Sequence, residues 1–369
     1  MKNGEDFLSL LPRELSMKIL TSYKDPSDLV RISAVSRSWR NFVIKNGLCK
    51  HLSLQMFPQL SRVDHVNELC GPAKGHAGVG AGSSNFMEWE TLEREHRVYA
   101  FLAHQCLLLS VWDCISEAII ASSTDNYPQE SIDNTLEPRA RVARGDSYWS
   151  SKGQSNPAVP ETLTYKLVAD LCVVKEIRIR PFQAYFHFGH PIYSAKSVRF
   201  RLGQIKSSPG NHVDESSRYS CNDKFSWTYT SQEFEMAQEN RLQSFKLPEP
   251  VLCIGGILQI ELLSRAQSCD IDGLFYFCVS HVQVVGRPLS PAFSIQLLEP
   301  SEKFVLEAKS YSLPALPEQM SSISSLQLRI SDLEHVMNLN GGNEGEVAEY
   351  GYEWVIDDDE ESDEEVELE

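Results

Sequence analysis

The sequence predicts a multidomain α+β chain, and three observations carry this prediction. Hydrophobic residues recur at helical spacing in the first fifty residues, alternate with polar ones from about residue 139, and give way to acidic residues at the end. Spacings of three and four indicate a helix, and alternation indicates a strand. We expect these parts: a three-helix unit at 1–55, a flexible linker at 56–85, a helical linker at 86–138, an antiparallel β-sandwich at 139–291, a short helix at 318–339 and a disordered acidic tail at 340–369.

Most of the net charge belongs to the tail. The chain carries 34 Lys and Arg against 51 Asp and Glu, for a formal charge of -17. From Glu344 onwards there are 14 acidic residues and no Lys or Arg, which leaves the preceding part at -3. With 42% hydrophobic residues overall, that part has enough apolar surface for a core, whereas the tail cannot bury enough to fold.

Nine cysteines occur without a C-x-x-C pair, and several lie in apolar runs. This is typical of reduced thiols that pack as small hydrophobes, and we expect no metal site and no cofactor. The N-terminus has acidic residues and a proline where a signal peptide needs an apolar core. Residues 98–120 contain charged side chains, which favours a buried helix over a membrane span. We expect an intracellular protein of the cytoplasm, the nucleus or both, without a membrane partner.

Residues 7–52 predict three short helices. Leu11, Leu15 and Ile19 recur at spacing four, which predicts a helix that starts at Pro12. Asp25 is a plausible N-cap of the second helix, with a proline at the first helical position, and the third opens near Ser36. So short a segment cannot bury all its own apolar surface, so we expect it to pack against the rest of the chain or another protein.

The order LP-x-EL, IL, DL and VS-x-x-W in this segment resembles the F-box. The positions that match are Leu11, Pro12, Glu14, Leu15, Ile19, Leu20, Asp28, Leu29, Val35, Ser36, Arg37 and Trp39. The resemblance implies docking on the Skp adaptor of an SCF (Skp, cullin, F-box) ubiquitin ligase, and through it association with cullin and RING subunits. The alternative is a helical subdomain that packs internally.

The adaptor contacts implied by the resemblance are mainly apolar, since a few large apolar anchors usually dominate such an interface. They are Leu11, Pro12, Leu15, Ile19, Leu20, Leu29, Val35, Ser36 and Trp39. Residues 1–52 hold nine Lys or Arg and five Asp or Glu. Their net positive charge suits Skp adaptors, which are acidic in general.

The next two segments are predicted to connect domains. Residues 71–85 are rich in glycine, but no Lys-Ser or Lys-Thr follows, so they indicate a linker and not a phosphate loop. Residues 86–122 have apolar side chains at spacings of three, four or seven, which predicts one long helix or two helices with a break.

From residue 139 the alternation predicts an antiparallel sandwich, since the strands follow one another without helices between them. The expected strands are residues 163–171, 174–180, 197–202, 225–229, 243–247, 257–263 and 275–285. Beyond residue 291 we expect irregular chain up to residue 317. A helix then follows, whose apolar seam either packs on the sandwich, the option we favour, or mediates self-association.

The opening of this sandwich, SYWSSKGQ before a strand that ends in Asp170-Leu171, resembles galactose-binding-like (discoidin-type) jelly rolls. Trp149 and Ser151 are further matching positions. The combination with the first segment is similar to a group of plant F-box proteins that carry such a sandwich. The resemblance implies binding of glycans or proteins through loops at one end of the fold, although fold alone does not supply function.

The candidate substrate-binding residues lie in and before the loop 181–193: Trp149, Ser151, Tyr185, Phe186, Phe188 and Tyr193. An exposed aromatic loop is a common interaction site, but aromatics of a strand that fill the core are an equally good interpretation. His187 and His190 do not indicate a metal pair, because no third ligand is evident.

A basic face is a further hypothesis. Arginines alternate with apolar residues in two predicted strands, so they would share a face if both strands belonged to one sheet; they are Arg178, Arg180, Arg199 and Arg201. Such a face could bind an acidic substrate segment, nucleic acid or the acidic tail, but an ordinary solvated face is favoured. Nucleic acid would need stacking aromatics among the arginines, which are not seen.

The sequence contains no catalytic motif: G-x-S-x-G, H-E-x-x-H and a Walker loop are all missing from it. We therefore expect a non-catalytic subunit of a ubiquitin ligase, which holds an unknown protein substrate near the conjugating enzyme. The alternative is a lectin-like module that binds glycan or protein outside a ligase, with Trp149 and Tyr185 stacked on sugar rings. Ser362 resembles an acidophilic kinase site, a weak motif.

Overall fold

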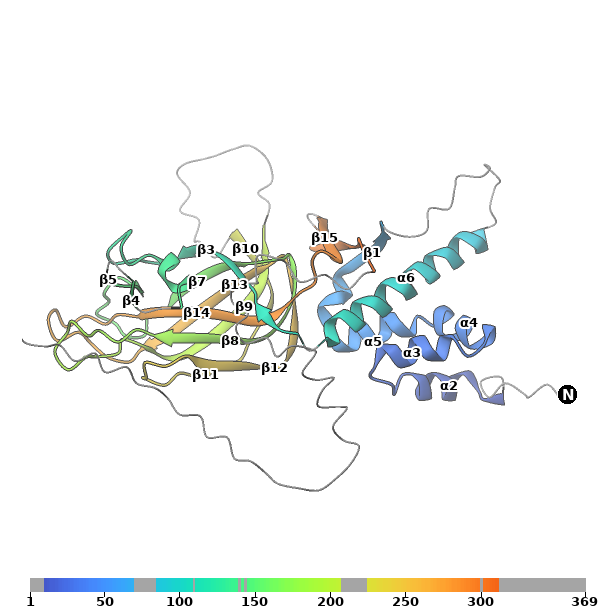
Figure 1. Cartoon of the computed structure of the whole chain (residues 1–369), viewed down its shortest axis with the longest axis horizontal. Coiled ribbons are helices and arrows are strands. Elements are labelled where there is room, and N and C mark those ends of the chain that lie inside the picture. The colour runs from blue at the N-terminus through green and yellow to red at the C-terminus, as the bar shows by residue number, and fades with distance from the viewer. Residues whose placement is uncertain are drawn as a thin grey trace, which may run out of the picture. The chain divides into compact units, whose positions relative to one another are not determined.

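The computed structural model describes residues 10–69, 84–108, 110–138, 141–142, 145–206, 224–298 and 301–311. The predicted helix 318–339, the acidic tail, Ser362 and the glycine-rich stretch 71–83 lie outside these residues. Within them, the α-helices end at residue 107 and the strands follow, apart from β1 Val63–Glu68, as the predicted α+β class requires (Figure 1). No helix in this part of the chain is long and apolar enough to cross a membrane.

Short helices form the N-terminal part. They are α2 Arg13–Leu20, α3 Pro26–Ser33, α4 Arg37–Lys45 and α5 Leu48–Met56, followed by the 3₁₀ turn η1 Pro58–Arg62. The carboxylate of Asp25 accepts a hydrogen bond from Ser27 N at 2.7 Å, and Ser36 Oγ accepts one from Trp39 N at 3.2 Å. These side chains cap α3 and α4 by satisfying N–H groups that the first turn leaves unpaired, which confirms both predicted helix starts.

The longest helix, α6 Ser84–Leu107, packs across these short helices (Figure 1). It is shorter than predicted, because the chain continues as β2 Trp112–Asp113 and β3 Ile115–Ala121. The prediction of helix up to residue 122 was therefore wrong. Isoleucines favour a strand once a partner is present, and β3 pairs with a strand about 45 residues later, Ile115 opposite Leu167.

Two antiparallel sheets form the predicted sandwich. One has the order β10-β9-β13-β7-β3, with β11 beside β9, and the other β12-β8-β14-β2, with β6 beside β14. The bounds are β6 Trp149–Ser150, β7 Glu161–Leu167, β8 Leu171–Pro181, β9 Ala195–Ile205, β10 Phe225–Thr230, β11 Phe234–Glu235, β12 Gln243–Ile254, β13 Ile257–Arg265 and β14 Cys278–Pro288. All seven predicted strands are present, which confirms the antiparallel sandwich.

A third sheet was not predicted. Its order is β1-β16-β15, with β1 Val63–Glu68 parallel to β16 Lys303–Ala308 and β15 Phe293–Leu298 antiparallel to it. The expectations of linker at β1 and irregular chain after residue 291 were therefore wrong. The 3₁₀ turn η2 Ile132–Leu136 and the small pair β4 Arg141–Val142 and β5 Gly145–Asp146 complete the described elements.

Two hydrophobic cores meet along β8 and β12. At the start of β8, Cys172 and Val174 belong to the sandwich core, whereas Leu171 and Val173 pack with the helices and the third sheet in the helical core. The end of β12, residues 251–254, alternates in the same way. Side chains of a strand point to opposite faces in turn, so this piece of sheet is covered on both sides.

A buried ion pair joins two strands of the larger sheet. Arg265 Nη2 at the end of β13 lies 2.9 Å from Glu161 Oε1 at the start of β7, with the side chains 0% and 4% exposed. The guanidinium carbon lies 4.4 Å from the centre of the Phe277 ring. Burial lowers the pKa of Arg265, and the carboxylate of Glu161 counteracts that effect.

We expect Arg265→Ala to lower the free energy of unfolding by about 3–5 kcal/mol, because it leaves the Glu161 carboxylate buried without its cation. Arg241→Ala is the matched control, since Arg241 and Glu239 are both exposed and such pairs contribute at most about 1 kcal/mol. Urea unfolding of both variants measures the difference. Equal midpoints for the two variants would contradict the role of the buried pair.

Candidate functional site

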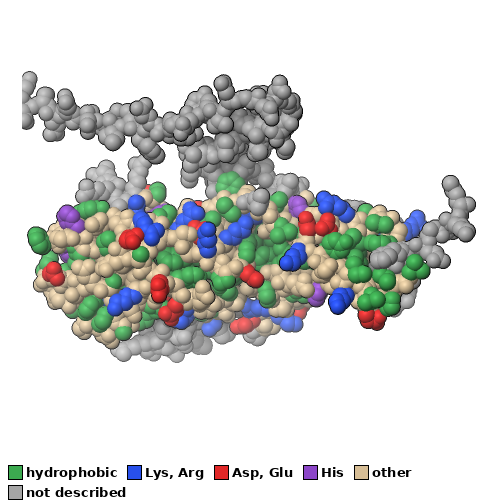
Figure 2. Space-filling model, turned by 90° about the horizontal axis from the view of Figure 1, so that it is seen from below, with side chains coloured by type: hydrophobic (Ala, Val, Ile, Leu, Met, Phe, Trp, Pro, Cys, Tyr) green, Lys and Arg blue, Asp and Glu red, His purple; other side chains and the backbone are tan. Residues whose placement is uncertain are grey.

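The first candidate surface lies on the N-terminal helices, where apolar side chains remain exposed although the core beneath them is filled. Leu15 is 48% exposed, Ile19 40% and Val35 64%. Pro12 and Ser36 are also exposed, while Leu11 and Trp39 are partly buried. We call these seven residues the adaptor face. Figure 2 shows hydrophobic side chains gathered over this end of the chain.

Two of the predicted contact residues are not on this face. Leu20 is 2% exposed and Leu29 1%, and both pack in the helical core with Val43 and Leu48. Leu20 follows the exposed Ile19 by one position, and consecutive positions on a helix face different sides. These two leucines therefore stabilise the packing of the helices. Any contact with a partner would be made by residues of the adaptor face.

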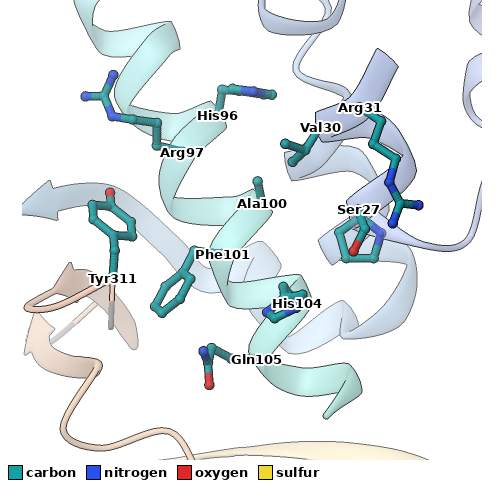
Figure 3. A pocket seen from close by; sticks show the side chains of 11 residues that line it. Ser27, Val30, Arg31, His96, Arg97, Ala100, Phe101, His104, Gln105 and Tyr311 are labelled. Atoms are coloured by element: carbon teal, nitrogen blue, oxygen red, sulfur yellow. The ribbon is translucent and has the colours of Figure 1, made fainter. Parts of the chain in front are cut away.

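A groove of about 650 Å³ lies beside α3 and α6. Val30 and Ser27 line it from α3, Ala100 and Phe101 from α6, and Tyr311 closes it on the far side of α6 (Figure 3). The rings of Phe101 and Tyr311 meet edge to face, with centroids 5.2 Å apart. Its lining is mainly apolar, and it continues the exposed apolar surface of α3.

His96 is a partly buried imidazole on this groove (Figure 3). Burial lowers its pKa to about 4, and the nearby guanidinium groups of Arg40 and Arg97 add to the shift. Among the described residues, no group hydrogen-bonds its Nδ1 atom. His96 is therefore neutral at physiological pH, and protonating it costs free energy in the folded state.

The second candidate surface is the loop between β8 and β9. The sequence left open whether its aromatic residues fill the core or form an exposed interaction site, and the loop contains both kinds. Phe182 and Tyr193 are buried, whereas Tyr185, Phe186 and Phe188 are exposed, Phe188 completely. The buried Phe182 ring stacks on Tyr148 with centroids 4.0 Å apart. The loop thus has a buried aromatic base and an exposed aromatic rim.

Trp149 and Ser151 are buried, so the structure does not support their prediction as ligand contacts. Trp149 is 0% exposed, and its Nε1 donates to Ser123 O at 3.1 Å. Ser151 Oγ accepts a hydrogen bond from Phe277 N at 3.0 Å. The W-x-S segment is therefore part of the sandwich core, because its side chains point inward from β6, and it cannot stack on a sugar ring.

The predicted basic face is not formed. Arg178 and Arg180 lie on β8, but Arg199 and Arg201 lie on β9, which belongs to the other sheet. Carboxylates also neutralise three of the four: Glu261 pairs with both Arg199 and Arg201, and Glu176 pairs with Arg178. The arginines do alternate with apolar residues along each strand. Which sheet a strand joins, however, depends on long-range pairing that the local pattern does not contain.

The structure reveals a cleft at this end of the sandwich that sequence reasoning missed. It has a volume of about 210 Å³ and is lined by residues within 125–130, 148–150, 184–193 and 269–278. Of the predicted substrate residues, Phe186 and Tyr193 line this end cleft. Its carboxylates come from Asp125, Glu130 and Asp272. Four separate segments form the cleft, so no local sequence pattern indicated it.

The described cysteines are buried free thiols. Burial raises the pKa of Cys49, Cys106 and Cys278 to about 12, which keeps them protonated at neutral pH. The described residues contain no group of three or more His, Cys, Asp or Glu side chains that could hold a metal ion.

The described part of the chain is thus a capped helical unit with exposed apolar side chains, packed on a β-sandwich that carries a second candidate surface. The family model described as F-box-like matches residues 8–55. The chain is 49% identical over 367 residues to the F-box protein At4g00755 of Arabidopsis thaliana, across 96% of this chain and 97% of that protein. The chain belongs to the F-box protein family.

Solved structures are similar to part of the chain. CBM32-3 from a family 31 glycoside hydrolase of Clostridium perfringens is 13% identical with a TM-score of 0.32, over 46% of this chain and 90% of that one. The family 32 carbohydrate-binding module of Streptococcus pneumoniae EndoD is 10% identical with a TM-score of 0.32, over 47% and 98%.

We expect Trp149→Ala to destabilise the protein by about 3–5 kcal/mol, because it empties a fully buried site, whereas Phe188→Ala changes stability by less than about 0.5 kcal/mol. Urea unfolding measures both. A Trp149→Ala variant as stable as the wild type would show that the indole is not part of the core.

We expect the stability of the protein to fall as the pH drops from about 6.5 to about 4, in part because the unfolded chain binds a proton at His96 that the folded chain does not. His96→Gln removes this component, so its free energy of unfolding should depend less steeply on pH, by up to about 1.4 kcal/mol per pH unit. Denaturant unfolding across this pH range measures both slopes. Parallel curves would mean that His96 titrates alike in both states.

Proposed function

We propose that the protein is the substrate receptor of an SCF-type ubiquitin ligase, which binds a Skp adaptor through its N-terminal helices and a target through its sandwich. Its membership of the F-box family supports the first part. The single observation that carries it is the adaptor face, where Leu15, Ile19 and Val35 stay exposed beside a filled core. Exposed apolar side chains of this size are typical of anchors in a protein interface.

In this proposal the chain contributes proximity and no chemical step of its own. Through the adaptor it joins cullin and RING subunits, and it holds a target near a conjugating enzyme, which raises the effective concentration of the acceptor lysine. The assembly acts in the cytoplasm, the nucleus or both. The free thiols of the described cysteines are compatible with a reducing compartment.

The end cleft with its exposed aromatic rim is the surface we assign to the target. Phe186 lines it, Phe188 follows two residues later in the same loop, and the side chains of both are exposed. A lectin-like module that acts outside a ligase is the second candidate, and the same cleft would serve it. The two functions differ in whether the protein binds a Skp adaptor, since a lectin that acts outside a ligase needs no contact on α2.

We expect the variant Leu15→Glu with Ile19→Glu to lose adaptor binding by about 30-fold or more, since a pair of hot-spot residues contributes upwards of about 2 kcal/mol. Both side chains are exposed on one face of α2, and glutamate is a good helix former, so the fold should persist. Titration of the full chain with a purified Skp adaptor measures the affinity.

The matched control is Val168→Glu, which places the same charge on an exposed apolar position of the sandwich. It should bind the adaptor as the wild type does. Undiminished binding by the double variant would reject the proposed adaptor face, and failure of the wild-type chain to bind any Skp adaptor would reject the ligase assignment.

A further inference from the structure

The end cleft has aromatic walls. Tyr148 lies over Phe182, and Phe186 follows with ring centroids 6.2 Å from both. His187 meets Phe186 edge to face at 4.7 Å, and its Nδ1 lies 2.8 Å from Tyr193 Oη. These rings fix one side of the cleft as a packed aromatic surface.

The polar groups of the end cleft are mostly acceptors. Tyr148 Oη donates to Glu130 Oε1 at 2.8 Å, Asn126 Nδ2 donates to the same atom at 3.0 Å, and Tyr276 Oη donates to Asp272 Oδ2 at 2.5 Å. These three side-chain donors of the cleft are thus engaged by its own carboxylates. A ligand must therefore bring donors of its own to the remaining carboxylate lone pairs.

The charge of the end cleft is negative. Asp125, Glu130 and Asp272 line it, and none of the described lining residues is Lys or Arg. Within the described part of the chain, the Asp125 carboxylate has no hydrogen-bond or ion-pair partner. Burial and then the carboxylates of Glu130 and Asp272 raise its pKa, against a smaller opposite effect of nearby Lys152. A positive group placed there would relieve this repulsion.

The size of the end cleft points to a single side chain. Its volume of about 210 Å³ is below the ~300 Å³ at which pockets for small-molecule ligands begin. Two large apolar side chains are exposed beside it: Ile271, which lines the cleft, is 80% exposed, and Phe188, which follows the lining residue His187, is fully exposed. One long side chain can enter, while the flanking residues of the same peptide meet the apolar rim.

We propose that the end cleft binds a Lys or Arg side chain of the target protein, inserted between its aromatic wall and its three carboxylates, with apolar neighbours on the rim. The stem of such a side chain packs on the rings, and its cationic head meets the carboxylates and the faces of the aromatics. The inference rests on the proposed function and names its substrate class: a basic segment with apolar neighbours. An ammonium or guanidinium group donates and does not accept, which matches this cleft better than a sugar hydroxyl.

The test is a positional-scanning peptide library bound to the full-length chain, with the central position fixed in turn as Lys, Arg, Gln or Glu. We expect peptides with Lys or Arg to bind about tenfold more tightly than those with Gln. This ratio of affinities corresponds to the contact of one partly desolvated cation with aromatic rings. The Asp125→Asn, Glu130→Gln double variant should lose this preference, and Phe186→Ala should weaken binding of every peptide. Both changes are outside the adaptor face.

The matched control is the Glu239→Gln, Glu249→Gln variant, which removes two exposed carboxylates elsewhere on the sandwich. It should keep the preference. A library without preference for Lys or Arg, or a preference that survives Asp125→Asn, Glu130→Gln, overturns the inference. The inference is also overturned if the wild-type chain binds glycans on an array and the Phe186→Ala variant does not. Adaptor titration of the same proteins separates these outcomes from failure of the proposed function, because that titration does not depend on the cleft.

Discussion

The double-sided burial of β8 and β12 is the constraint on which the rest of the described structure depends. At the start of β8 and the end of β12, every side chain is buried, with alternate residues in the sandwich core and the helical core. Each core alone would leave one face of these strands in water. A charged residue at Val173 or Leu252 would therefore enter the helical core, and one at Cys172 or Cys253 the sandwich core, because each strand is a wall that the two cores share.

This shared wall also separates the two surfaces. Leu171 begins β8 against the helices, and Pro181 ends it where the aromatic loop starts. A strand of 11 residues spans roughly 33 Å at about 3.3 Å per residue. The adaptor face and the end cleft thus sit beyond opposite ends of one strand. In the proposed function, a target bound in the cleft would therefore stay clear of the adaptor.

Local features could be predicted from the sequence, and long-range ones could not. Asp25 and Ser36 cap helices through atoms within three residues of themselves, and seven strands follow from alternation. The parallel pairing of β1 with β16 joins segments some 240 residues apart, so no window of sequence contains it. The alternation of Phe293, Ile295 and Leu297 was a usable signal for β15. The end cleft had none, since its four segments become neighbours only in the fold.

The segment singled out at the sequence level as a ligand contact has a different role, beneath the end cleft. Trp149 Nε1 bonds Ser123 O, Ser150 O accepts from Asp125 N at 3.0 Å, and Ser151 Oγ accepts from Phe277 N. β6 therefore holds the backbone of the loops that carry Asp125 and Tyr276. A resemblance detects such supporting residues because their packing is demanding, while the side chains that meet a ligand are exposed and can vary without cost to the fold. The resemblance thus pointed to the end of the sandwich where the cleft lies, through the buried side chains of Trp149 and Ser151.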